Sequence, residues 1–157
     1  MILYEAYVYK QALDAALDHA KTAAGQGLEA MGLFIGQPYT YQGTPYTLVH
    51  HYVTAPNNST AVSVRFSPQA ISQLAQQYAR HHKGKLITGW CHSHPSYGCF
   101  LSQTDVNTQR RFFSEPWHVA MVIDPLSKQG NSPLYRMFKL EGSTYRECSF
   151  AIIEPRS

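Results

Sequence analysis

Short stretches in which hydrophobic and polar residues alternate, or in which apolar residues run together, predict β-strands along most of the chain. The segment 29–36 is almost wholly apolar after its leading acid, whereas 1–9 alternates with period two. The predicted strands are 1–9, 29–36, 45–54, 62–66, 85–91, 117–124, 134–140 and 144–153.

Apolar residues at helical spacing predict three helices between these strands. The first covers 11–24, with Gly25 to end it, and the second opens at Ser67-Pro68, an N-cap residue followed by proline. The third covers 102–113. This order predicts an α/β or α+β fold, in which a mixed sheet is flanked by helices. Because no repeat or long linker interrupts the pattern, we expect one domain over 1–157.

Composition narrows the class of protein without naming a function. Of the 157 residues, 44% are hydrophobic and 13% aromatic, which excludes a disordered chain. The net charge of +3 comes from scattered basic residues, so we expect no nucleic-acid partner. No apolar stretch approaches the length of a membrane span, and Cys91, Cys99 and Cys148 cannot all pair within one chain. We therefore expect a cytoplasmic protein with no membrane contact.

The strongest chemical pattern follows the strand 85–91. His92 and His94 are two residues apart at the end of an extended segment, so their imidazoles leave the same face and can converge. Pro95 turns the chain into a loop, and Asp105 returns in the first turn of the next helix. Two imidazoles and a carboxylate suit Zn²⁺ and leave its fourth tetrahedral position open, as in a catalytic site.

Each half of this pattern has an ordinary alternative. An isolated H-x-H often arises by chance, and Ser102 with Asp105 three residues later forms a plausible capping box. We expect one of the two roles of Asp105, helix cap or metal ligand, to dominate. The combination of both halves is much more specific than either.

The stretch GWCHSHPSYGCFLSQTDVNTQ (89–109) resembles the signature of the JAMM (MPN-plus) zinc metalloproteases. The likeness is strongest to the ubiquitin isopeptidase of the proteasome lid and the deneddylase of the signalosome. It continues in EAMGLFIG (29–36) and VAMVIDP (119–125), and so spans most of the chain. The resemblance implies a single MPN/JAMM domain with a mostly antiparallel, cytidine-deaminase-like fold.

The resemblance also implies roles for individual residues. His92, His94 and Asp105 would hold one Zn²⁺ per chain. Glu29 would act as general base and then as general acid toward the leaving amine, and Ser102 would donate a hydrogen bond to the oxyanion. Other divalent metals, Fe²⁺ or Co²⁺, suit the same ligands.

Glu29 has support from its own surroundings. An acid that leads an apolar strand lies close to the core, where an unpaired carboxylate is costly and a nearby cation would offset the cost. The alternative is an exposed glutamate at a strand end. Spacing alone does not select Glu29 over Glu115, because pairing between distant strands is invisible in the sequence.

The substrate class implied by the resemblance is ubiquitin or a ubiquitin-like protein, cleaved after its C-terminal Gly-Gly in deconjugation or precursor processing. Association with a proteasome is a further expectation, and the short chain suggests a prokaryotic or otherwise free-standing enzyme. The segment expected to hold the substrate tail contains Asn57, Asn58, Ser59, Thr60, Val62 and Val64.

Two other functions remain open at this stage. The same site could act on a sulfur-carrier protein or a small amide, or the domain could be a non-catalytic MPN scaffold. A cysteine nucleophile would be unnecessary beside zinc. The adjacent pairs His50-His51 and His81-His82 are expected to face solvent or to be satisfied structurally, and His118 to be structural.

Overall fold

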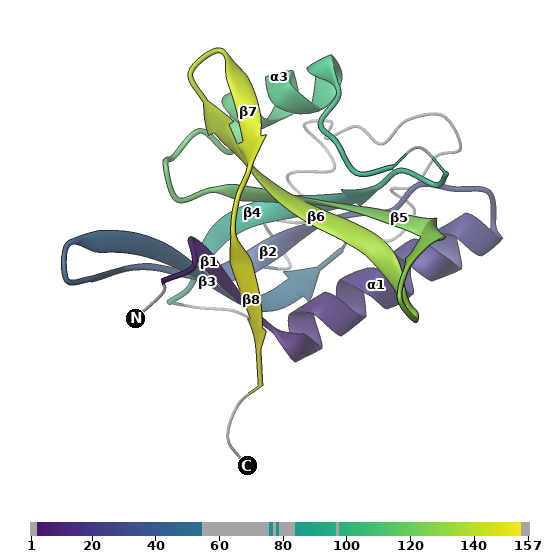
Figure 1. Ribbon diagram of the computed structural model, residues 1–157, viewed down its shortest axis with the longest axis horizontal. Coiled ribbons are helices and arrows are strands. Elements are labelled where there is room, and N and C mark those ends of the chain that lie inside the picture. The colour runs from purple at the N-terminus through teal and green to yellow at the C-terminus, as the bar shows by residue number, and fades with distance from the viewer. Residues whose placement is uncertain (1–2, 55–75, 77, 79–83, 97, 155–157) are drawn as a thin grey trace.

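The strands of the described residues all join in a single curled sheet (Figure 1). The computed structural model describes residues 3–54, 76, 78, 84–96 and 98–154. The strands are β1 (Ala6–Tyr9), β2 (Met31–Tyr41), β3 (Thr44–Val53), β4 (Leu86–Ser93), β5 (Val119–Gln129), β6 (Ser132–Glu141), β7 (Thr144–Glu147) and β8 (Phe150–Ile153). Their order in the sheet is β7-β6-β5-β4-β2-β3-β1-β8. The β1–β3, β1–β8 and β4–β5 pairs are parallel and the other four antiparallel, which confirms the predicted mixed, mostly antiparallel sheet.

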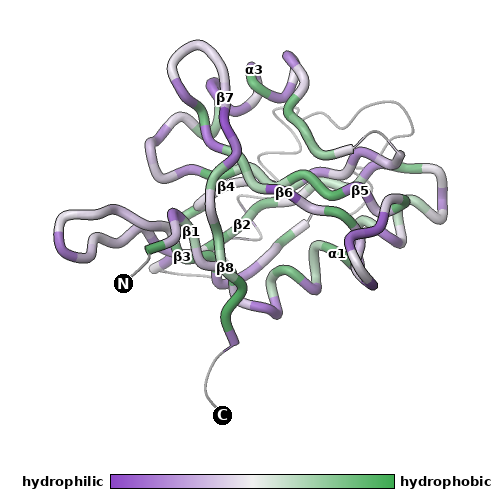
Figure 2. Tube along the Cα trace, in the orientation of Figure 1, coloured by the Kyte–Doolittle hydropathy of each residue, from purple (hydrophilic) through white to green (hydrophobic). Residues whose placement is uncertain are grey.

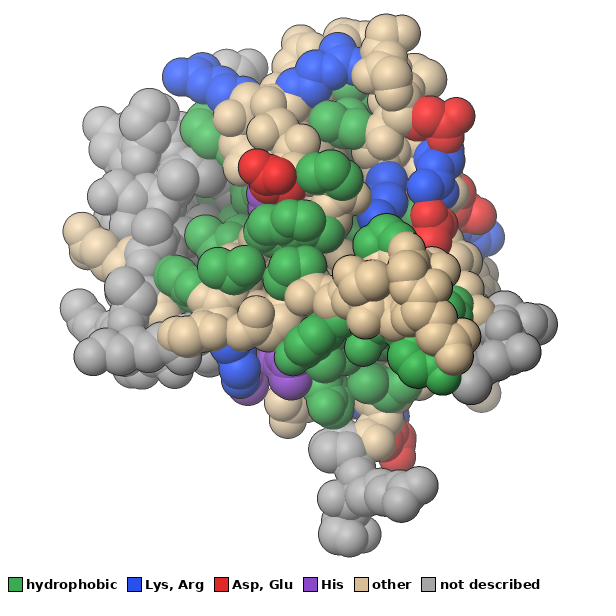
Figure 3. Space-filling model, turned by 90° about the vertical axis from the view of Figure 1, so that its left-hand side faces the viewer, with side chains coloured by type: hydrophobic (Ala, Val, Ile, Leu, Met, Phe, Trp, Pro, Cys, Tyr) green, Lys and Arg blue, Asp and Glu red, His purple; other side chains and the backbone are tan. Residues whose placement is uncertain are grey.

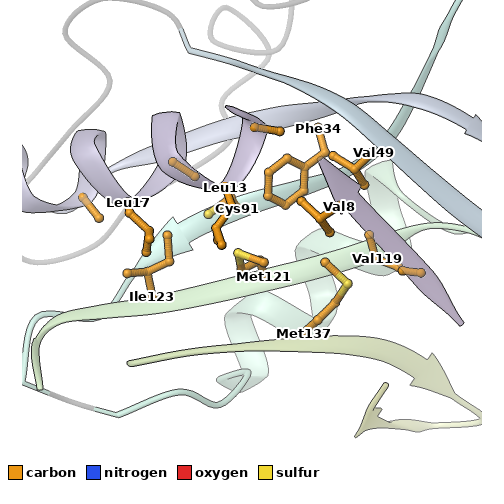
Figure 4. Packing of buried hydrophobic residues seen from close by; sticks show 14 of the residues in the cluster. Val8, Leu13, Leu17, Phe34, Val49, Cys91, Val119, Met121, Ile123 and Met137 are labelled. Carbon is orange, nitrogen blue, oxygen red and sulfur yellow. The ribbon is translucent and has the colours of Figure 1, made fainter. Parts of the chain in front are cut away.

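Helix α1 (Lys10–Gly25) covers one face of the sheet (Figure 1). Hydrophobic and hydrophilic residues alternate along it (Figure 2), and its buried side, which includes Leu13 and Leu17, faces the strands. Phe34, Cys91 and Met121, from three different strands, meet that side in the cluster drawn in Figure 4. The helix runs slightly further than expected, because the chain turns at Gly27, whose φ is +71°, and not at Gly25.

Helix α3 (Gln103–Phe112) lies on the opposite face of the sheet (Figure 1). A second hydrophobic cluster fills the space beneath it. Val106 of α3 meets Trp90 of β4 there, together with Met31 at the start of β2. The central strands are therefore buried on both sides, which explains their nearly continuous apolar sequences.

The hairpin of β2 and β3 is longer than the sequence predicts. The strand expected to end at residue 36 continues to Tyr41, where Gln42 and Gly43 form a two-residue turn with φ of 49° and 80°. Two positive φ values are typical of a type I′ hairpin turn. Gln-Gly is a weaker signal for such a turn than Asn-Gly, so the pattern did not reveal it.

The segment expected to be one strand over 144–153 is two strands that pair with different partners. β7 pairs with β6, and β8 pairs in parallel with β1 at the other end of the sheet order. Between them, the N–H of Cys148 donates to the carbonyl of Met137. The strands at the two ends of the sheet order, β7 and β8, are thus consecutive in the chain. Periodicity alone could not show this arrangement.

The predicted strand 62–66 and most of the predicted helix from Ser67 lie outside the described residues. Gln76 and Tyr78 belong to the described part and are helical. Within the described ranges, no helix is both long and apolar enough to cross a membrane.

Candidate metal centre

Two imidazoles converge at the end of β4. His92 belongs to the strand and His94 follows it, and their Nε2 atoms lie 2.9 Å apart. Both residues are buried, with 3% and 7% of their surface exposed. The two-residue spacing places both rings on the face of the sheet that α3 covers.

Asp105 approaches the same point from α3. Its Oδ2 lies 3.1 Å from Nε2 of His92 and 3.3 Å from Nε2 of His94. Three ligand atoms from two elements therefore meet in one buried place, and no other such group of three was found among the described residues.

The triangle of ligand atoms fits a tetrahedral metal ion. Ligand atoms 2.0–2.1 Å from zinc in tetrahedral geometry are separated by about 3.3 to 3.4 Å. The three separations, 2.9, 3.1 and 3.3 Å, lie at or slightly below this range. The nitrogen and oxygen donors are those that zinc accepts, and three protein ligands leave a fourth position open.

One oxygen of Asp105, Oδ2, takes part both in the N-terminal cap of α3 and in the cluster with the two histidines. The N–H of Ser102 donates to Oδ2 of Asp105 at 2.9 Å, and the N–H of Asp105 donates to Oγ of Ser102 at 3.1 Å. The capping box therefore forms while the same Oδ2 faces both imidazoles. A carboxylate oxygen has a lone pair for each direction, so the cap leaves Oδ2 able to face the imidazoles. That one of the two roles dominates when a metal is bound stays a prediction. The cap fixes the direction in which Asp105 points.

The ionisation of the cluster favours metal binding. Burial alone would raise the pKa of Asp105, but its contacts with His92 and His94 and the N–H of Ser102 hold that pKa well below the usual range. Burial lowers the pKa of His92, so its neutral form is favoured. An ionised carboxylate and a neutral imidazole are the protonation states that a metal requires.

Glu29 stands two residues before Met31, which pairs with the ligand candidate His92. Met31 pairs with His92 across β2 and β4, and the N–H of Ser93 donates to the carbonyl of Ala30 at 2.9 Å. Continued by two residues, this register would set Glu29 opposite His94, and directly paired residues direct their side chains to the same face. Only 5% of Glu29 is exposed, so it is not the exposed strand-end glutamate of the alternative reading.

The loop that follows the histidines is anchored by a residue to which sequence reasoning assigned no role. The buried carboxylate of Asp124, on β5, accepts hydrogen bonds from the N–H groups of Ser96 and Gly98, both at 2.8 Å. It also accepts from the N–H of Leu126 and the hydroxyl of Ser127. The VAMVIDP motif was visible in the sequence, but the partners of its aspartate were not.

Within the described ranges, the thiols and the other histidines that were considered do not supply a competing site. The pair His81-His82 lies outside these ranges. Burial raises the pKa of Cys99 to about 11 and also raises that of Cys91, so both thiols stay protonated at neutral pH. Nε2 of His118 contacts the carbonyl oxygen of Ile87 at 3.1 Å, in agreement with a structural role. His51 contacts Lys85.

The predicted tail-binding residues, 57–60 together with Val62 and Val64, lie outside the described residues. A cavity of about 520 Å³ lies elsewhere, at the β2–β3 hairpin, where hydrophobic side chains form a band (Figure 3). Tyr39, Tyr46 and Trp117 line it. It is separated from the histidines by the length of β2 from Met31 to Pro38, roughly 23 Å at 3.3 Å per residue.

Comparison with known proteins relates the chain to one family. The sequence profile described as JAB1/Mov34/MPN/PAD-1 ubiquitin protease matches residues 3–115. The 26S proteasome non-ATPase regulatory subunit 14 of Dictyostelium discoideum is 36% identical over 123 residues, which are 76% of this chain and 38% of that protein. The ubiquitin carboxyl-terminal hydrolase RPN11 of Saccharomyces cerevisiae is 31% identical over 139 residues, covering 85% of this chain and 43% of the relative.

A third relative is the COP9 signalosome complex subunit 5 of Caenorhabditis elegans, 38% identical over 116 residues, which are 69% of this chain and 29% of the relative. The chain thus spans less than half of the length of each of these three relatives.

Two solved structures share the fold. One is the solution structure of a Desulfitobacterium hafniense protein, with a TM-score of 0.66 and 20% identity, covering 96% of this chain and 94% of that one. The other is the crystal structure of a JAB1/MPN domain protein from Archaeoglobus fulgidus, with a TM-score of 0.55 and 18% identity, covering 94% and 99%. At these identities the likeness concerns the fold alone, and it agrees with the predicted fold class.

Proposed function

The chain belongs to the JAB1/Mov34/MPN/PAD-1 ubiquitin protease family, and from this premise we propose that it is a zinc-dependent peptidase or isopeptidase. Its substrate would be ubiquitin or a ubiquitin-like protein, cleaved after the C-terminal Gly-Gly. The main support is the convergence of His92, His94 and Asp105 in one buried cluster. Glu29 is buried as well, two residues before Met31, which pairs with His92. A non-catalytic scaffold would have no need of all four groups.

The donor set suits a single zinc ion held by Nε2 of His92, Nε2 of His94 and a carboxylate oxygen of Asp105. Zinc in such a site supplies a Lewis acid that polarises a carbonyl and lowers the pKa of a water molecule to about 7. The surrounding chain keeps the three donors buried. It also holds the pKa of Asp105 well below its usual range and lowers that of His92 by burial.

In this proposal Glu29 moves the proton. Its carboxylate accepts a proton from the attacking water and then delivers it to the leaving amine, a transfer worth typically about 10²- to 10⁴-fold in rate. The burial of Glu29 and its place two residues before Met31, which pairs with His92, support this role.

Ser102 is proposed to stabilise the oxyanion that develops on the scissile carbonyl. Its Oγ accepts the N–H of Asp105, which leaves the hydroxyl proton available for donation. The capping box holds this hydroxyl close to the ligand that it precedes.

The names of the relatives point to ubiquitin chemistry at a proteasome, and we extend both to this chain as part of the proposal. We also propose a cytoplasmic enzyme in which 1–157 act as one domain. The segment that includes Asn57, Asn58, Ser59 and Thr60 would hold the substrate tail. Deletion of 57–60 should then raise KM for a ubiquitin substrate, and an unchanged KM would remove this part of the proposal.

Metal removal tests the proposal as a whole. Purified protein should hydrolyse a fluorogenic ubiquitin C-terminal amide and a diubiquitin, lose this activity in a zinc chelator and regain it when zinc is returned. Inactivity with one zinc bound per chain would favour a sulfur-carrier protein or small amide as substrate. Failure to bind zinc would favour the scaffold.

A further inference from the structure

The indole of Trp90 lies flat against the imidazole of His92. The ring centroids are 4.4 Å apart and the planes differ by 8°. Both side chains are buried, with 2% and 3% exposed, so no solvent separates or loosens the stack. A parallel neighbour at this distance prevents the imidazole from tilting and keeps its Nε2 directed toward His94 and Asp105.

The second ring nitrogen of His92, Nδ1, distinguishes this residue from most metal-binding histidines. Such residues usually donate their second ring N–H to an acceptor, which fixes the orientation of the ring. In the described part of the chain, the buried Nδ1 of His92 has no hydrogen-bond partner. The orientation of this ring therefore depends on packing, and Trp90 supplies the flat surface.

Trp90 is itself held by α3. Its Nε1–H donates to Oε1 of Gln109 at 3.2 Å, and Gln109 is 1% exposed. Phe113, the C-cap of the helix, stacks on the same indole with planes 9° apart. Asp105, Gln109 and Phe113 follow one another at intervals of four residues, so one face of α3 presents a ligand, a hydrogen-bond acceptor and an aromatic ring.

We infer that Trp90 and Gln109 are positioning residues for the metal ligand His92. Through them α3, which contributes Asp105 directly, also sets the orientation of the histidine on β4. The two elements that supply the ligands are thus kept in register by one buried hydrogen bond and one stack. This inference rests on the metal site of the proposed function.

Zinc affinity is the direct test, because it does not depend on turnover. In Trp90→Leu the stack is lost, and affinity measured by competition with a chelating indicator should fall about 10- to 100-fold, the usual cost of losing an outer partner of a ligand. Co²⁺ bound to this variant should show altered absorption bands, since those bands report ligand geometry. The matched control is Phe34→Leu, a buried aromatic on the opposite face, which should keep wild-type affinity.

Gln109→Leu is the milder variant, and it tests the positioning role if Trp90→Leu does not fold. It removes only the acceptor of the indole N–H, and we expect about a tenfold loss of zinc affinity. In Trp90→Phe, which has no N–H, the further change Gln109→Leu should cost nothing more.

Wild-type affinity and an unchanged Co²⁺ spectrum in folded Gln109→Leu and Trp90→Leu would overturn this inference and leave the proposed function standing. A wild-type protein that binds no zinc would overturn both.

Discussion

Ser93 stands between the two histidines, but its hydrogen bonds go to the neighbouring strand. Its N–H donates to the carbonyl of Ala30, and its Oγ accepts the N–H of Ala30 at 2.7 Å. This pair of bonds holds the residue that follows Glu29. The distance between the proposed base and the proposed ligands is therefore fixed by a side chain that belongs to neither group.

Replacement of Ser93 by alanine should lower kcat while zinc affinity stays at the wild-type value. The buried N–H of Ala30 would lose its acceptor, so the free energy of unfolding should fall by about 1–3 kcal/mol. Denaturant unfolding, zinc titration and hydrolysis of a ubiquitin amide measure the three quantities. An equal loss of zinc affinity and of kcat would show that Ser93 acts through the ligands instead.

The sequence predicted the positions of some site residues but not of others. The convergence of His92 and His94 could be predicted because it depends only on the period of an extended chain. Glu29 could not be chosen from spacing, since its place depends on contacts between residues 63 positions apart, such as Ala30 with Ser93. The contact of Trp90 with Gln109 was hidden for the same reason.

At the scale of elements, the loop between β4 and α3 depends on β5. The main-chain N–H groups of Ser96 and Gly98 both donate to Asp124, and both residues have positive φ, 70° and 82°. Burial alone would raise the pKa of Asp124, but the four hydrogen bonds together hold that pKa below its ordinary value. An ionised side chain thus fixes the path of the loop between the ligand-bearing elements.

Asp124→Asn should loosen this loop. The amide offers one acceptor oxygen in place of two and has no charge, so the free energy of unfolding should fall by about 1.5–3 kcal/mol. Hydrogen exchange at the amides of Ser96 and Gly98 should become faster. Ser127→Ala, which removes a single bond to the same carboxylate, should have a smaller effect on both. Unchanged exchange in Asp124→Asn would show that the loop is held by other contacts.

The sequence predicted where helices and strands lie better than it predicted their lengths or the strands with which they pair. Helix α3 was located by its N-cap, a local signal. The long β2–β3 hairpin was missed because its Gln42-Gly43 turn has weak turn chemistry, and the division of 144–153 into β7 and β8 depends on partners at opposite ends of the sheet order.

At the scale of the whole molecule, the residue before β1 is tied to β7 and to the link between β7 and β8. Arg146 of β7 makes two hydrogen bonds to the carboxylate of Glu5, which also accepts the N–H of Ser149. The hydrogen bond from Arg146 is the largest cause of a lowered pKa for Glu5. This contact joins segments more than 140 residues apart and closes the curled sheet.

Glu5→Gln should reduce stability at neutral pH, by less than about 1 kcal/mol because the ion pair is partly exposed. Since the pKa of Glu5 is lowered in the folded state, its contribution is complete above the ordinary value of 4.5 and is lost as the pH falls through the lower folded value. Unfolding curves of wild type and variant should therefore converge in acid. Glu154→Gln is the control, and a gap between the curves that stays constant as the pH falls would contradict this account.

The most direct test of the proposed metal centre compares Glu29→Gln with Glu115→Gln, an exposed control. Each protein would be loaded with zinc, its metal content measured, and its rate of diubiquitin hydrolysis determined. We predict one zinc per chain in both variants, a wild-type rate for Glu115→Gln, and a rate lower by about 10²- to 10⁴-fold for Glu29→Gln. A zinc-loaded Glu29→Gln protein that hydrolyses diubiquitin as fast as wild type would contradict the account.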